Sequence, residues 1–273
     1  MVTKYEKSRK GLSKKESKLL SKLSRKGKKI IKIGDIENEL DVTYDNAKNI
    51  ASNLKRKGWF DRIQRGKYVI VPLEAGENGK FTEHEFIIAS ELVSPYYIAF
   101  LSALNFHGFT EQTPMSVFVA TTKRANKRTI HDIPYHFVTI NKEKFFGTEK
   151  YSVSGSSIVI SDPEKTLIDC LDHLEYSGGI EQIANGLKEA SLDLEKLVDY
   201  ALRTENGAAI KRLDYLLDLL DLEIQEHLKK RLEENYSNSY SLLDTTKPSK
   251  GKYSSEWMLR INVSKDDILG DAY

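Results

Sequence analysis

The chain has 273 residues, of which 40% are hydrophobic, and its 42 Lys and Arg residues nearly balance 40 Asp and Glu residues. This length allows two domains with separate hydrophobic cores. The longest uncharged, mostly apolar run, residues 96–104, is too short to cross a bilayer, and the first residues lack the apolar stretch of a signal peptide. The single cysteine, Cys170, excludes an internal disulfide, so we expect a cytoplasmic protein without membrane association.

The charges divide unevenly along the chain. Residues 1–67 contain 20 basic and 8 acidic side chains, and the remaining 206 residues contain the other 22 basic and 32 acidic ones. A cationic module gains free energy when it displaces counterions from a polyanion, whereas an acidic one is repelled from the same surface. The division therefore predicts two parts with different functions, the first of which binds nucleic acid.

The first elements are a basic segment and two short helices. Residues 1–16 are rich in lysine and poor in apolar residues, which predicts a flexible basic arm. Leucines at helical spacing predict a helix over residues 17–24, which Gly27 ends. A short apolar run at residues 30–33 then leads into a second helix that extends to Leu40.

A third helix is predicted over residues 44–57, with Thr43 as its N-cap. Its apolar side chains recur at the spacing of one helix face, which we expect to face a core. They are Ala47, Ile50, Ala51 and Leu54.

The opposite face of this third helix is polar and suits the edges of DNA bases. Asparagine can pair with adenine and arginine with guanine, while small side chains let a helix enter the major groove. We therefore expect DNA contacts from this face and its flanks. The candidate residues are Thr43, Tyr44, Asn46, Lys48, Asn49, Ser52, Asn53, Arg56 and Lys57.

A hairpin follows, with strands at residues 59–64 and 67–71 joined by a turn at Arg65 and Gly66. Three helices and a basic hairpin form the order of a winged helix-turn-helix domain, which we expect over residues 17–72. Such a domain can also serve for protein contacts, but the positive charge favours DNA. Phosphate contacts are expected from Arg62, Arg65 and Lys67.

A linker at residues 73–80 and an effector domain at residues 81–273 complete the predicted α+β protein. The second domain is expected to be mixed α/β, with a small sheet and a helical C-terminal half. Helices are predicted over residues 82–92 and from Pro95 to His107, and strands over residues 117–121, 135–140 and 156–160. Further helices at 180–190, 194–203, 208–220 and 224–232 are followed by a closing strand at 257–263.

The second domain shows no recognisable active site in its sequence, and we expect neither catalysis nor a cofactor or metal. Residues 161–164 resemble a carboxylate cluster, but each suits the start of a helix: Ser161 or Asp162 as the N-cap, Pro163 in the first turn and Glu164 at the positive end of the helix dipole. His107 is expected to interact with the last carbonyls of its own helix. A basic run offers a second phosphate contact or a docking site for an acidic partner, and consists of Lys123, Arg124, Lys127 and Arg128.

Three segments together resemble the AbiEi family of antitoxins and transcriptional regulators. The first is residues 54–60 with 65–68, the second is residues 97–104 with 107–112, and the third is residues 159–169. The similarity extends over about residues 17–263, and the second segment is the most specific of the three.

The resemblance implies a bifunctional protein of a type IV toxin–antitoxin system. In this family the winged helix represses its own operon at inverted repeats of the promoter, an arrangement that suits a dimer on DNA. The C-terminal domain opposes a nucleotidyltransferase-like toxin without requiring a stable complex, and the setting is phage defence by abortive infection. The DNA-contacting positions that the resemblance implies are those of the third helix and the hairpin.

Two other functions remain open at this point. One is a winged-helix regulator whose second domain senses a ligand, and the other is an enzyme that acts on DNA. An adjacent gene for a nucleotidyltransferase-like protein would distinguish the antitoxin from the plain regulator, whereas magnesium-dependent cleavage or modification of DNA would favour the enzyme.

Overall fold

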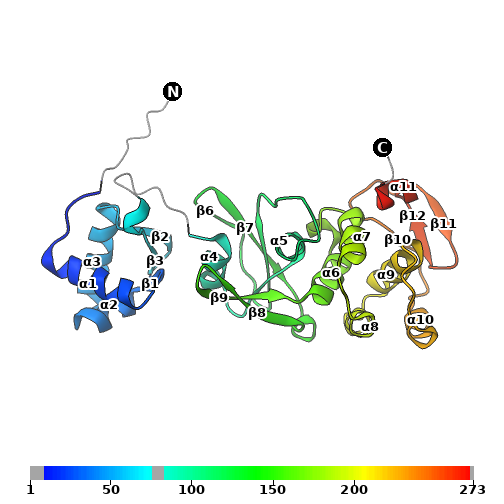
Figure 1. Cartoon of the computed structure of the whole chain (residues 1–273), viewed down its shortest axis with the longest axis horizontal. Coiled ribbons are helices and arrows are strands. Elements are labelled where there is room, and N and C mark those ends of the chain that lie inside the picture. The colour runs from blue at the N-terminus through cyan, green and yellow to red at the C-terminus, as the bar shows by residue number, and fades with distance from the viewer. Residues whose placement is uncertain (1–8, 76–82, 271–273) are drawn as a thin grey trace, which may run out of the picture. The chain divides into compact units, whose positions relative to one another are not determined.

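The computed structural model describes residues 9–75 and 83–270 (Figure 1). The chain divides into two compact units, Met1–Ile88 and Ala89–Tyr273. Over the described residues it contains eleven α-helices and three sheets, which confirms the α+β class. Residues 1–8 of the expected arm and 76–80 of the expected linker lie outside the described residues. Within the described part, no helix is both long and apolar enough to cross a membrane.

The first unit combines three helices with a three-stranded antiparallel sheet. The strand order is β1-β3-β2, and strands β2 and β3 form the predicted hairpin. A short 3-10 helix, Leu73–Ala75, follows the sheet. The elements are α1 (Lys14–Arg25), β1 (Ile30–Lys32), α2 (Ile33–Leu40), α3 (Tyr44–Arg56), β2 (Phe60–Gln64) and β3 (Lys67–Ile70).

Residues 9–16 do not form the flexible arm that the sequence predicted. Helix α1 begins three residues earlier than expected, because the Ser13 hydroxyl accepts from the amide of Glu16 at 3.3 Å and the Glu16 carboxylate accepts from the amide of Ser13 at 2.7 Å. The carbonyl of Lys10 accepts from the Trp59 indole at 2.9 Å, and the amide of Lys10 donates to the Lys57 carbonyl at 3.1 Å. These bonds hold the segment against the end of α3.

The core of the first unit forms around the apolar face of α3. Ala47, Ala51 and Leu54 are fully buried, as the spacing predicted, and Ile50 is partly buried. The remaining core side chains come from α1, α2 and the sheet, and include Leu19, Leu23, Ile31, Ile36, Phe60 and Tyr68.

The second unit contains a six-stranded mixed sheet, which is larger than the small sheet we expected. Its order is β6-β7-β5-β4-β9-β8. Pro95 does not begin a helix: Tyr97 and Ile98 form β4 between β5 and β9, and the helix starts at Phe100. The boundary between the two units falls within α4 (Glu85–Leu92). The elements that follow it are β4 (Tyr97–Ile98), α5 (Phe100–Phe106), β5 (Val117–Thr121), β6 (Arg128–Ile130), β7 (Ile133–Thr139), β8 (Thr148–Val153) and β9 (Ser156–Ser161).

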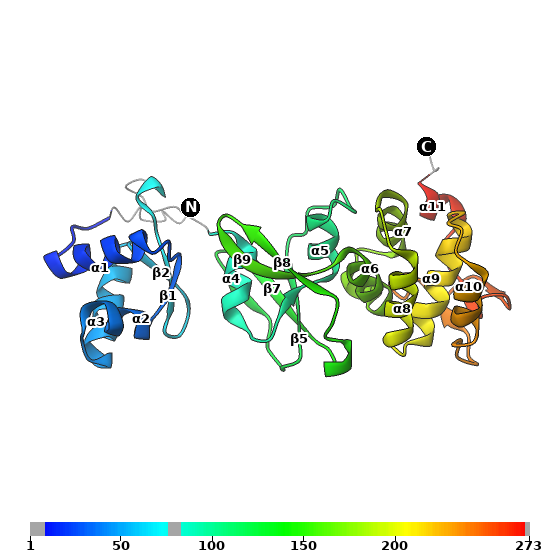
Figure 2. The same ribbon diagram turned by 60° about the horizontal axis from the view of Figure 1, so that its bottom comes forward.

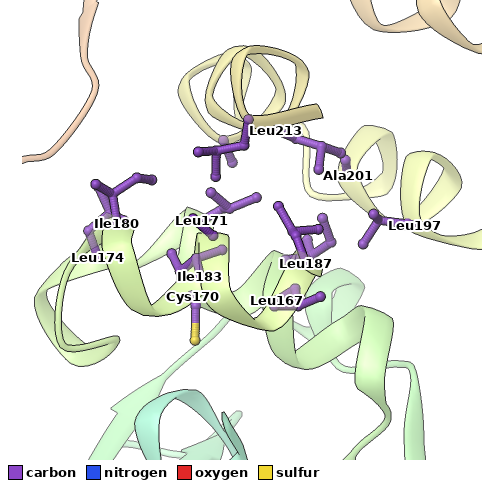
Figure 3. Close-up of a cluster of buried hydrophobic side chains, with 14 of the residues drawn as sticks. Leu167, Cys170, Leu171, Leu174, Ile180, Ile183, Leu187, Leu197, Ala201 and Leu213 are labelled. Carbon is purple, nitrogen blue, oxygen red and sulfur yellow. The ribbon is translucent and has the colours of Figure 1, made fainter. Parts of the chain in front are cut away.

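The C-terminal half of the second unit is helical, and its helices gather to one side of the sheet (Figures 1 and 2). Apolar side chains of α6, α7, α8 and α9 meet in one buried cluster, in which Leu167, Leu171, Ile183 and Leu213 are fully buried (Figure 3). The helices are α6 (Pro163–Asp172), α7 (Ile180–Glu189), α8 (Leu194–Arg203), α9 (Gly207–Leu219) and α10 (Glu226–Glu233).

A third, small sheet lies near the C-terminus of the described chain. The expected closing strand at residues 257–263 is shorter than predicted and lies between two other strands in the order β10-β12-β11. Strand β12 pairs in parallel with β10 and antiparallel with β11. The elements are β10 (Ser241–Leu242), β11 (Lys252–Ser254), β12 (Leu259–Ile261) and α11 (Lys265–Leu269).

The two N-caps of the first unit allow a matched stability test. Thr43 occupies the N-cap of α3, but its hydroxyl makes no capping hydrogen bond, contrary to the sequence prediction, whereas Ser13 forms a capping box. We expect Ser13→Ala to lower the free energy of unfolding of the first unit by about 1 kcal/mol and Thr43→Ala to change it by only a few tenths.

Urea denaturation followed by Trp59 fluorescence in a Trp257→Phe background measures both effects, because these are the two tryptophans of the chain. Equal losses for the two variants would contradict the assignment of the caps.

Candidate nucleic-acid interface

The solvent-facing side of α3 carries most of the DNA-contacting candidates. Since Ala47, Ala51 and Leu54 face the core, residues on the other side of the helix are turned to water. Asn53 and Lys57 are half-buried at the edge of this surface. The exposed candidates are Thr43, Tyr44, Asn46, Lys48, Asn49, Ser52 and Arg56.

The cations of this surface differ in how far they are neutralised. The Lys57 ammonium lies 2.5 Å from a Glu16 carboxylate oxygen, and its charge is therefore compensated within the unit. Burial raises the pKa of Glu16, but its bonds to Lys57 and Ser13 outweigh burial, and the net pKa is lowered. Over residues 9–75 and 83–270, no carboxylate forms an ion pair with Lys48 or Arg56.

Arg56 is held in place by a neighbour on the same helix. Its Nη2 donates to the side-chain oxygen of Asn53 at 2.9 Å. A guanidinium has five N–H donors, so this single bond leaves others directed to solvent. Arg56 is thus pre-oriented on the exposed face while it keeps the donors needed for a base or a phosphate.

The turn between β2 and β3 presents a second group of cations. Gly66 has φ +76°, a conformation that glycine adopts without strain, and Arg65 beside it is exposed. Arg62 is also exposed, and its Nε donates to the carbonyl of Gln64 at 3.3 Å. Lys67 is half-buried within the sheet. The hairpin therefore presents two exposed arginines in addition to the exposed cations of α3.

The basic run of the second unit lies in the connection from β5 to β6. Lys123, Arg124 and Lys127 are exposed, whereas Arg128 is half-buried and begins β6. Three of the four candidates are thus accessible to a polyanion.

A buried charge network, which the sequence analysis did not identify, connects β4 with α6. The Lys165 side chain of α6 is fully buried and bonds to Asp169, one turn further along the helix. The Tyr97 hydroxyl of β4 donates to the second Asp169 oxygen at 2.9 Å. Burial raises the pKa of Tyr97 and also that of Asp169, although Lys165 opposes the shift at Asp169. The only sequence signal for this network was the spacing of Lys165 and Asp169 by four residues.

The contact of His107 corrects our expectation for this residue. Its Nε2 lies 2.8 Å from the carbonyl oxygen of Ser161, not from a carbonyl of its own helix. Because a carbonyl only accepts, Nε2 donates the hydrogen, and burial lowers the pKa of the imidazole. Asp162 caps α6 by accepting from the Lys165 amide at 2.8 Å, as predicted, with Pro163 at the first helical position. These residues therefore have structural roles.

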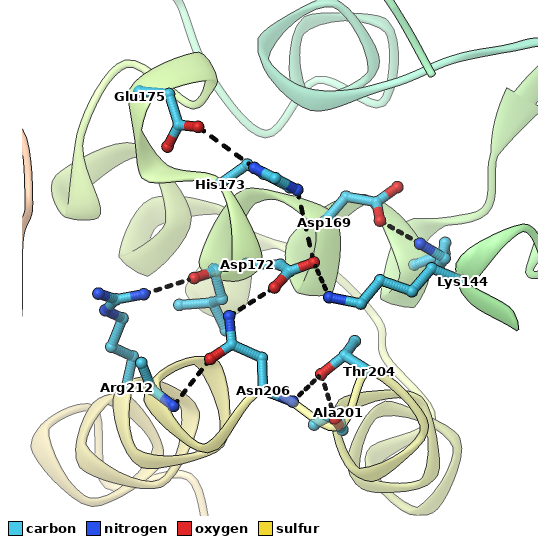
Figure 4. Close-up of polar contacts among 12 residues, drawn as sticks. Lys144, Asp169, Asp172, His173, Glu175, Ala201, Thr204, Asn206 and Arg212 are labelled. Carbon is cyan, nitrogen blue, oxygen red and sulfur yellow. Dashed lines mark hydrogen bonds and ion pairs between the residues drawn. The ribbon is translucent and has the colours of Figure 1, made fainter. Parts of the chain in front are cut away.

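The C-terminal end of α6 is held by a second polar network (Figure 4). Asp172 accepts from Lys144 at 2.7 Å and from the Asn206 amide at 2.6 Å. The Arg212 guanidinium of α9 donates to the Leu171 carbonyl at 2.9 Å. In the described part of the chain, no group of three or more His, Cys, Asp or Glu side chains is arranged to hold a metal ion.

The arrangement of elements defines an α+β protein with a three-helix, three-stranded first unit and a larger mixed second unit. Comparisons with protein-family models and with curated proteins gave no match. The chain is similar to the crystal structure of the RV2827C protein from Mycobacterium tuberculosis, with a TM-score of 0.66 and 14% sequence identity over 99% of this chain and 98% of that chain. At this identity the likeness shows a shared fold.

The buried Lys165 network predicts strongly non-additive stability effects. Lys165→Met leaves the Asp169 carboxylate buried without its cation, and we expect a loss of about 3–5 kcal/mol. Replacing all three polar partners, in Lys165→Met with Asp169→Leu and Tyr97→Phe, should recover most of that loss, because no unpaired polar group remains.

Urea denaturation followed by Trp257 fluorescence in a Trp59→Phe background measures these differences. A loss below about 1 kcal/mol for the single variant would show that the ion pair is not needed.

Proposed function

We propose that the first unit is a winged helix-turn-helix domain and that it binds double-stranded promoter DNA through α3 and the β2–β3 hairpin. The observation that carries this proposal is the division of α3 into a buried apolar face and an exposed face with Asn49, Ser52 and Arg56. Asparagine and arginine on an exposed helix face match the donor and acceptor patterns of the major groove.

The connections around α3 support this assignment. Helix α2 ends at Leu40, and Asp41, with φ 50° and ψ 62°, turns the chain so that α3 begins at Tyr44. A short turn between two helices is the connection of a helix-turn-helix, whose second helix enters the groove. In the hairpin, Arg62 and Arg65 are suited to phosphates beside that groove, where they fix the position of the protein without reading sequence.

We further propose that the chain represses its own operon and acts as an AbiEi-like antitoxin in the cytoplasm. The support is the resemblance of three segments of the sequence to that family. In this proposal the first unit binds inverted repeats of the promoter, and the acidic second unit counters a nucleotidyltransferase-like toxin without a stable complex. The opposite net charges of the two parts of the chain are consistent with such a division of labour.

Alanine substitutions on α3 test the DNA-binding proposal. We expect Asn49→Ala and Arg56→Ala each to weaken binding to the upstream region of the gene by roughly 1–3 kcal/mol, because each removes a base contact. Arg25→Ala is the matched control, since Arg25 is an exposed arginine of α1 without an ion pair within the described residues. Fluorescence anisotropy with labelled duplexes measures all three affinities.

Binding to a shuffled duplex of the same composition distinguishes base contacts from phosphate contacts. If Asn49 and Arg56 read bases, the shuffled duplex should show much smaller losses. Equal losses on the two duplexes would assign the residues to phosphates, and unchanged affinity for both would reject α3 as the recognition helix.

Co-expression tests the antitoxin role separately. We expect the full chain to restore growth to cells that produce the nucleotidyltransferase-like protein of the neighbouring gene. Arg56→Ala should restore growth equally well at the same protein level, because DNA binding and antitoxicity reside in different units. Rescue that is lost together with DNA binding would contradict this separation.

A further inference from the structure

The small sheet β10-β12-β11 carries exposed aromatic side chains on one face. Among the residues that the structure describes, five large hydrophobic side chains are exposed, and two of these belong to this sheet region. Tyr253 of β11 is 62% exposed, and Tyr240, just before β10, is 45% exposed. Their ring centroids lie 5.0 Å apart with an interplanar angle of 76°. Two neighbouring tyrosine rings are thus accessible to solvent on the second unit.

The register of the sheet places an arginine on the same face. Tyr253 is directly opposite Arg260 in the antiparallel pair, and Leu242 is opposite Arg260 in the parallel pair. Opposed residues of neighbouring strands project to the same side, and adjacent residues of one strand project to opposite sides. The Arg260 guanidinium carbon accordingly lies 5.2 Å from the Tyr253 ring centroid. Leu259, on the other face, is fully buried in the core.

The segment that carries the two tyrosines is locally basic, although residues 68–273 are acidic as a whole. Residues 237–255 contain three lysines and a single carboxylate, Asp244, which is buried and accepts from the Ile180 amide at 3.0 Å. Lys247 pairs with Glu181 at 3.2 Å. Lys250 and Lys252 are exposed, and no carboxylate in the described ranges forms an ion pair with either. Lys252 projects from β11 on the side away from Tyr253, so the two uncompensated cations add positive charge at the edge of the sheet and not on the tyrosine face itself.

We propose that this face binds single-stranded nucleic acid, with bases stacked on Tyr240 and Tyr253 and phosphates attracted by Arg260 on the same face and by Lys250 and Lys252 at the adjoining edge of the sheet. Exposed aromatic rings beside cations are the combination that single-stranded sites use, since every base has a π-face that stacks without regard to sequence. Arg260 supports the Tyr253 ring and adds positive charge at the same place. A duplex is a poor partner, because its bases are already stacked on one another.

This site is separate from the duplex interface proposed for α3 and lies on a different unit of the chain. The two surfaces also differ in chemistry. The α3 surface offers asparagine, serine and arginine, which suit base edges, whereas the C-terminal sheet offers ring faces, which suit unpaired bases.

The test measures the affinity of the full-length protein for a labelled single-stranded RNA of about 12 nucleotides. Excess unlabelled duplex DNA is present to occupy the first unit. We expect Tyr253→Ala and Tyr240→Ala each to weaken binding by about tenfold, because each removes a stacking surface. Tyr253→Phe is the matched control, since it retains the ring and should bind like the unsubstituted chain. Arg56→Ala should also bind this RNA normally, which distinguishes this site from the α3 interface.

Three results would overturn the proposal. The first is an unsubstituted chain that does not bind the RNA at low ionic strength, and the second is unchanged affinity in both alanine variants. The third is a Tyr253→Phe loss as large as that of Tyr253→Ala, because the hydroxyl and not the ring would then be responsible. Thermal unfolding followed by circular dichroism verifies that the variants remain folded, as expected for exposed side chains.

Discussion

The packing of one face of α3 against the core determines which side chains of this helix remain exposed to solvent. Ala47 and Ala51 have no exposed surface, and their small side chains allow other elements of the core to approach the helix closely. Leu54 extends the same buried stripe by one turn. Because an α-helix has 3.6 residues per turn, burial of this stripe forces Asn49, Ser52 and Arg56 toward solvent. Core packing and the proposed DNA recognition thus use opposite faces of one helix.

The second unit depends in a similar way on α6, which is held at three places along its length. Asp162 and Pro163 begin the helix, the buried Lys165 and Asp169 pair joins it to β4, and Arg212 satisfies a carbonyl at its end. A buried charge is stable only when it is paired and hydrogen-bonded, so these groups need one another. The sequence of residues 159–169 therefore has a structural explanation in this fold.

The local patterns of the first unit were sufficient to predict its helices and its hairpin from sequence. Helical spacing identified α3, and the Arg65–Gly66 turn identified the hairpin, because these signals involve residues close together in the chain. The bonds of Lys10 were missed, since they depend on Trp59 and Lys57, far along the sequence. The compensation of Lys57 by Glu16 was missed for the same reason. The capping box of Ser13 and Glu16 is a local signal that was overlooked.

The sheet of the second unit was less accessible to sequence reasoning. Strand β4 has two residues, and its apolar spacing resembled that of the helix that follows it. Its strand conformation comes from pairing with β5 and β9, which is a tertiary effect that overrides local preference. The exposed face of β10-β12-β11 was also not predicted, because two of its strands had no recognised pattern and the position of Tyr253 beside Arg260 depends on register.

The salt dependence of DNA binding tests the central claim most directly. The measurement compares the affinity of the full chain for the duplex upstream of its gene with that for a shuffled duplex over a series of salt concentrations. If α3 lies in the major groove and the hairpin contacts phosphates, the logarithm of the association constant should fall linearly with the logarithm of the salt concentration for both duplexes. The slope should be about −0.9 for each phosphate contact. The upstream duplex should bind roughly 10³-fold more tightly or better. Equal affinities for the two duplexes, or an affinity that does not change with salt, would contradict the account.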